Sequence, residues 1–128
     1  MSANNDISEW VRLAEMDVAT AHHMLKTFYP KPLEIVCFHA QQAAEKIIKG
    51  YLVSQGIEPP KTHDMQVLLE MCVEIDIKFD DIYEEATTLT NYAVRLRYPT
   101  ELALTEQDAE KAIENADKVM DFVRAYIA

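Results

Sequence analysis

The chain has 128 residues, of which 49% are hydrophobic, and this is the size of one domain that buries about two-thirds of its unfolded surface. It carries 12 Lys and Arg residues against 22 Asp and Glu residues, and the net charge of −10 argues against broad coating of nucleic acid or of an anionic membrane. We therefore expect a single domain over residues 1–128 that needs no disulfide bond.

The N-terminus and the cysteines indicate a cytoplasmic protein. The first six residues lack the basic and apolar regions of a signal peptide, and no apolar run reaches the ~18 residues of a transmembrane span. Cys37 and Cys72 fall on apolar helical faces, where free thiols are ordinary in a reducing compartment. The sequence therefore predicts a soluble cytoplasmic protein without a membrane span.

Two long helices are predicted in the N-terminal half. A capping box over residues 6–9 begins the first helix, which ends near Tyr29. Pro32 begins the second helix, which runs to about Gln55, where Gly56 suits a C-terminal stop. The apolar face of the first helix is formed by Trp10, Leu13, Ala14, Ala21, Met24 and Phe28.

Three further helices are predicted after Gly56. Thr62 or Asp64 caps a short third helix, a fourth begins near Phe79 and stops at Pro99, and Thr105 caps a fifth. The apolar stripe of the fifth helix comprises Ala109, Ala112, Ile113, Ala116, Val119, Met120, Val123 and Ile127. Four long helices and one short helix, joined by short loops, predict an all-α fold, an antiparallel up-and-down four-helix bundle with an additional short helix.

The second predicted helix is apolar on more than one side. Its polar residues form a ridge with steps of three, four and three: His39, Gln42, Lys46 and Lys49. Ile35, Phe38 and Val53 lie beside that ridge, outside the main apolar arc. A helix of this kind is central in a bundle or also meets a second subunit, so we expect a homodimer with an isologous contact between the two second helices.

Asp17 interrupts the apolar face of the first helix. Burial of an unpaired carboxylate costs several kcal/mol, so Asp17 requires a cation or an opening in the bundle. Arg97 continues the apolar row of the fourth helix and is the favoured partner, and Lys46 is the competing one. Asp17, His39 and Gln42 are the candidates for a buried or cleft position, either as structural contacts or as functional groups.

The remaining basic side chains suggest one anion site. The candidates for phosphate or nucleotide binding are Lys46, Lys49, Lys61, His63, Arg95 and Arg97, with Tyr98 as an aromatic face for a base. His22 and His23 diverge by about 100° on a helix and cannot share a metal. Because there is also no Gly-rich phosphate loop, paired-cysteine motif or nucleophile elbow, we predict no metal and no cofactor.

Three ordered motifs resemble the HEPN domain (higher eukaryotes and prokaryotes nucleotide-binding). They are FHAQQAAEK over 38–46 with KGYL over 49–52, KTHDM over 61–65, and RYP over 97–99. The resemblance covers nearly the whole chain. It implies a helical bundle, commonly a homodimer, often encoded beside a minimal nucleotidyltransferase with which it forms a toxin–antitoxin pair.

One motif of the catalytic members is absent. Ribonucleases of this family share a motif in which an arginine is followed, after four to six intervening residues, by a histidine. This sequence has no histidine after His63. Without an imidazole there, no side chain near Arg95 or Arg97 titrates near neutrality, so no catalytic residue is assigned. The sequence predicts a non-catalytic binding module that docks a nucleotidyltransferase or holds a nucleotide or RNA phosphate. The alternative is a divergent metal-independent ribonuclease toxin that uses Arg95 or Arg97 with His63 or His39.

Overall fold

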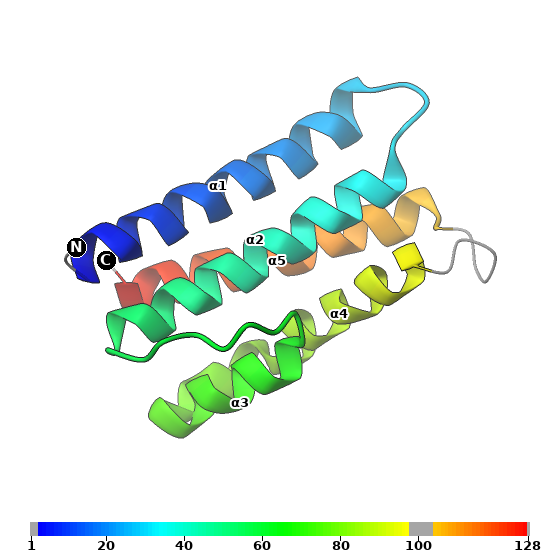
Figure 1. The fold of residues 1–128 in the computed structure, drawn as a ribbon. Coiled ribbons are helices and arrows are strands. Elements are labelled where there is room, and N and C mark those ends of the chain that lie inside the picture. The colour runs from blue at the N-terminus through cyan, green and yellow to red at the C-terminus, as the bar shows by residue number, and fades with distance from the viewer. Residues whose placement is uncertain (1–2, 98–103, 128) are drawn as a thin grey trace.

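The computed structural model of the protein describes residues 3–97 and 104–127, with side chains over 7–90 and 104–127. Its regular elements are helical throughout this part of the chain (Figure 1). The α-helices are α1 (Ala3–Thr27), α2 (Leu33–Ser54), α3 (Met65–Ile75), α4 (Tyr83–Arg97) and α5 (Glu106–Ile127), and a 3-10 helix, Ile77–Ile82, precedes α4. The predicted all-α fold is confirmed.

The four long helices alternate in direction, and α3 is the additional short helix (Figure 1). α2 is the central helix: it contacts α1, α3, α4 and α5, and 13 of its 22 residues are buried. Where the described residues allow contacts to be assigned, α1 and α4 do not touch, because α2 and α5 lie between them (Figure 1). No helix in the described ranges is long and apolar enough to cross a membrane.

Small residues bring α1 close to α2. Ala14 and Ala21 of α1 and Ala40, Ala43 and Ala44 of α2 are fully buried. Gly50 belongs to the same contact, because a Cβ atom there would lie 3.0 Å from Cβ of Trp10. Glycine in a helix interior costs about 0.5–1 kcal/mol relative to alanine, and here the close approach of Trp10 accounts for it.

Phe79 anchors the 3-10 helix in the core. Its side chain is fully buried, and its ring centroid lies 4.4 Å from that of Tyr51 on α2 and 5.2 and 5.0 Å from those of Phe122 and Tyr126 on α5. Clustered aromatic rings stabilise a core beyond the area that they bury. The segment between α3 and α4 is thereby held against α2 and α5.

Some predicted boundaries are right and others are wrong. Asp64 caps α3 by accepting from N of Gln66, and Thr105 caps α5 by accepting from N of Asp108. However, α1 begins at Ala3, so the capping box over 6–9 is not its start. The fourth helix begins at Tyr83, because Asp76 accepts from N of Lys78 and starts a separate 3-10 turn.

Candidate functional site

Asp17 joins α1 to the polar ridge of α2. It is 8% exposed, and its Oδ2 accepts a 2.6 Å hydrogen bond from Nζ of Lys46. Its Oδ1 lies 2.8 Å from Nδ1 of His39, which donates because a carboxylate only accepts. His39 and Lys46 are seven residues apart on α2, about two turns, so both reach one carboxylate from the same face.

The cation found on Asp17 among the described side chains is Lys46, the second of the two predicted candidates. The favoured one, Arg97, has a side chain that lies outside the described residues. The preference for Arg97 rested on its place in the apolar row of the fourth helix, whereas α1 packs on α2 and α5. Direct contact between α1 and α2 brings Lys46 to Asp17, and pairing of Asp17 with Arg97 stays a prediction.

Glu45 is the centre of a second buried network. It is 4% exposed and accepts hydrogen bonds from Nζ of Lys49 at 3.0 Å, from Nε2 of Gln41 at 2.8 Å and from Nδ1 of His63 at 3.0 Å. Gln42 donates from its Nε2 to Oε1 of Gln41 at 2.9 Å, which extends the network along α2. Because His63 lies in the connection between α2 and α3, Glu45 also holds that connection against α2.

Sequence reasoning missed Glu45 and Gln41 as site residues. A signal was present, since Gln41, Glu45 and Lys49 are spaced four residues apart, which places them on one face of a helix. Their burial could not be read from spacing, because i, i+4 pairs of this kind are usually solvated.

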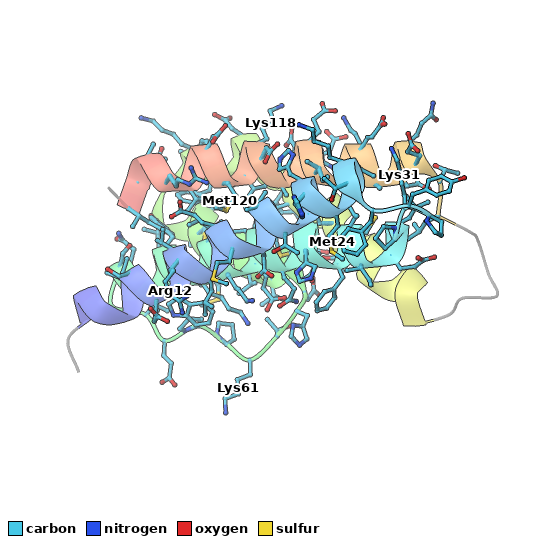
Figure 2. All side chains as sticks on the ribbon, turned by 90° about the horizontal axis from the view of Figure 1, so that it is seen from above. Arg12, Met24, Lys31, Lys61, Lys118 and Met120 are labelled. Atoms are coloured by element: carbon cyan, nitrogen blue, oxygen red, sulfur yellow. The ribbon has the colours of Figure 1, made fainter. Side chains whose placement is uncertain are left out.

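The described members of the predicted basic cluster are largely neutralised. Lys46 faces Asp17, and both Lys49 and His63 face Glu45. Each of these carboxylates therefore balances one lysine, and a phosphate at either lysine would have to compete with it. Lys61 is exposed and points away from the bundle (Figure 2).

Convergence of the whole predicted set stays a prediction. Tyr98 lies outside the described residues, and so do the side chains of Arg95 and Arg97.

His39 has an oriented ring and an open face, as does His63, whose Nδ1 is held by Glu45. Its Nδ1 is held by Asp17, and its Nε2 has no hydrogen-bond partner among the described side chains. No buried side-chain nitrogen or oxygen in that set lacks a partner, so Nε2 is open to solvent. An imidazole that donates from Nδ1 to a carboxylate presents a basic lone pair on Nε2, which is the arrangement of a general base.

The cysteines are structural. Cys37 and Cys72 are buried and form no disulfide, and burial raises the pKa of the Cys72 thiol to about 12. A thiol with such a pKa is protonated at neutral pH and is a poor nucleophile. Within the described ranges no group of three or more His, Cys, Asp and Glu residues could hold a metal ion, and His22 pairs with Asp117 of α5 instead.

Two apolar side chains lie exposed beside His39. Ile35 and Phe38 are each 45% exposed, whereas Val53 is partly buried. The Phe38 ring meets the His39 ring edge-on, with centroids 5.4 Å apart. The apolar face predicted for a second subunit is therefore open at the N-terminal half of α2.

The fold and these networks define a class of protein, a single helical bundle built around one central helix whose polar residues are buried against α1 and the α2–α3 connection. The HEPN domain model matches residues 7–126, and the chain belongs to the HEPN domain family.

Two solved structures of similar fold agree with this family assignment. The archaeal HEPN homologue ST0689 is 31% identical, with a TM-score of 0.76 over 95% of this chain and 98% of its own. TT1696 from Thermus thermophilus is 28% identical, with a TM-score of 0.76 over 94% of this chain and 98% of its own. Among curated proteins, one of Methanocaldococcus jannaschii named "Putative toxin MJ1304" is 26% identical over 134 residues, covering 92% of this chain and 86% of that protein.

Proposed function

We propose that the chain is a non-catalytic HEPN-type binding subunit, a homodimer that docks a minimal nucleotidyltransferase. The observation that carries the proposal is the ion pairing and the exposure of side chains on α2 and the α2–α3 connection. Lys46, Lys49 and His63 are committed to buried carboxylates that hold the bundle together, while Ile35 and Phe38 remain exposed. A protein contact is therefore better supported than binding of a nucleotide or RNA phosphate at those lysines.

Self-association is favoured by the symmetry of such a contact. Fully burying an exposed Ile or Phe side chain contributes about 1.5–3 kcal/mol, and Ile35 and Phe38, each 45% exposed, would contribute less than half of that apiece. In an isologous contact each residue is buried twice, once in each copy, so Ile35 and Phe38 place four such side chains in the interface.

We expect Phe38→Glu to convert a dimer into a monomer, because two carboxylates would face each other near the twofold axis. Light scattering after size exclusion at micromolar concentration measures this. Ile77→Glu is the matched control, since Ile77 is 72% exposed and lies in the 3-10 helix and not on α2, and the dimer should persist. A wild-type protein that is monomeric at this concentration would refute the homodimer.

The docking proposal is tested by co-expression with a small nucleotidyltransferase encoded beside the gene. We expect the two proteins to co-elute in size exclusion and the chain alone to leave RNA intact. A neighbouring nucleotidyltransferase that elutes separately would contradict docking, and RNA cleavage by the purified chain would contradict the non-catalytic assignment.

A second candidate function is metal-independent ribonuclease activity. The Asp17–His39 pair favours it, because it orients an imidazole with an accessible Nε2, and the name of the Methanocaldococcus jannaschii relative is consistent with a toxin. If the chain cleaves RNA in EDTA, His39→Ala should reduce the rate by about 10²–10⁴-fold.

His22→Ala is the matched control for that experiment, because His22 also pairs with an aspartate, Asp117, but lies on the α5 side of α1. Arg97→Ala tests the arginine of the sequence prediction in the same assay. Cleavage that survives His39→Ala would remove the Asp17–His39 pair from the mechanism.

A further inference from the structure

A cationic segment interrupts the acidic chain around the α1–α2 connection. There is no Asp or Glu between Asp17 and Glu34, although the whole chain has 22 acidic residues. The same stretch contains four basic side chains: His22, His23, Lys26 and Lys31. Among the described side chains, this stretch therefore favours local attraction of an anion outside the neutralised networks of α2.

Two aromatic side chains are exposed in the middle of this stretch. Tyr29 is 94% exposed and Phe28 is 50% exposed. Phe28 was predicted in the apolar face of α1, but α1 ends at Thr27 and the Phe28 side chain is not buried in the core. Exposed aromatic rings contribute little to the stability of the fold, whereas they offer flat surfaces on which nucleic-acid bases can stack.

A hollow of about 710 Å³ lies beside the connection, between α1 and α5. Leu25 and Ile113 contribute apolar side chains to it, and His23, Lys26 and Lys31 contribute polar ones. Figure 2 shows Lys31 beside the first turn of α5, where its Nζ lies 3.3 Å from the exposed carboxylate of Glu106.

The charges around the hollow permit a local anion contact of modest strength. His23 and Lys26 have no carboxylate partner among the described side chains, unlike Lys46 and Lys49. Acidic groups also face the region, namely Glu106 on Lys31, Asp117 on His22, and Glu110 in the lining of the hollow. Affinity must therefore depend on stacking as well as on charge.

We propose that this surface, the α1–α2 end (His23, Lys26, Phe28, Tyr29 and Lys31), binds single-stranded nucleic acid. Bases stack on Tyr29 and Phe28, and the flanking phosphates contact Lys26 and Lys31. The site uses none of the residues of the proposed dimer contact, Ile35 and Phe38, so variants of either surface can be tested with the other left unchanged. Unpaired bases are required, because a base inside a duplex cannot stack on a side chain.

The test is fluorescence polarisation of a labelled single-stranded RNA of about 12 nucleotides with the full chain, against the same sequence as a duplex. We expect preferential binding of the single strand.

Two phosphate contacts predict that log K falls with log salt concentration with a slope of about −1.4. Tyr29→Ala should weaken binding about 5- to 100-fold, whereas Tyr29→Phe should retain it. Lys26→Ala should reduce the magnitude of the slope by about 0.7.

Ile77→Ala and Lys78→Ala are the matched controls, because both side chains are exposed and adjacent to each other in the 3-10 helix. They should bind like the wild type. Tyr29→Ala should keep the wild-type mass, melting temperature and capture of the nucleotidyltransferase, since Tyr29 makes little contact with the core.

Three results would overturn the proposal. The first is wild-type affinity in both Tyr29→Ala and Lys26→Ala, and the second is equal binding of duplex and single strand. The third is absence of RNA binding by the wild type. If Tyr29→Ala then also loses capture of the nucleotidyltransferase, the α1–α2 end is a protein contact instead.

Discussion

Replacing Glu45 by alanine should lower the free energy of unfolding by about 3–5 kcal/mol. Glu45 is 4% exposed, and it accepts hydrogen bonds from Lys49, Gln41 and His63. Without it, the Lys49 ammonium stays in a side chain that is only 10% exposed and has no carboxylate beside it among the described residues. Urea denaturation monitored by circular dichroism measures the loss.

Lys49→Met is the informative companion to Glu45→Ala. The Glu45 carboxylate then keeps the donors on Gln41 and His63, so the loss should be clearly smaller than in Glu45→Ala. If Glu45→Ala costs less than about 1 kcal/mol, the carboxylate is solvated and the network does not hold the α2–α3 connection.

Asp17→Ala should lower the free energy of unfolding by about 2–4 kcal/mol, somewhat less than Glu45→Ala. Asp17 is the acceptor for Lys46 and His39, and the Lys46 side chain is 25% exposed, so the stranded ammonium can reach water in part. Addition of Lys46→Met to Asp17→Ala should recover part of the loss, because no charge is then left uncompensated.

Glu9→Ala is the matched control for Asp17→Ala, because Glu9 is also a carboxylate of α1 paired with a cation, Arg12, but both side chains are more than half exposed. Exposed pairs contribute little because water screens them, so this change should be nearly neutral. Equal losses in Asp17→Ala and Glu9→Ala would show that burial of the Asp17 pair has no energetic consequence.

These stability predictions bear on function. If both networks are structural, the polar ridge of α2 cannot be counted as a binding site, and RNA or nucleotide contacts must come from elsewhere. If Asp17→Ala is stable but inactive in RNA cleavage, the Asp17–His39 pair acts in chemistry instead. Measuring stability and activity on the same variants separates the two roles.

The sequence by itself determined the fold class and the central place of the second helix. Apolar spacing, with Pro32, Gly56, Asp64 and Thr105 at the joints, locates α2, α3 and α5 to within about two residues. Apolar spacing was sufficient to locate these helices because backbone hydrogen bonds and apolar periodicity are local properties. The FHAQQAAEK, KTHDM and RYP motifs indicated the family for the same reason, since each is a short continuous segment.

Only the tertiary structure decided which charges meet. Lys46 was ranked below Arg97 as the partner of Asp17, and Glu45 was not recognised, because ion pairing depends on which helices are neighbours and how deeply they are buried. Exposure of Phe28 and Tyr29 likewise follows from where α1 ends against the core. Spacing along one helix gives the face of a residue, whereas the partner across that face is set by the packing of α1 on α2.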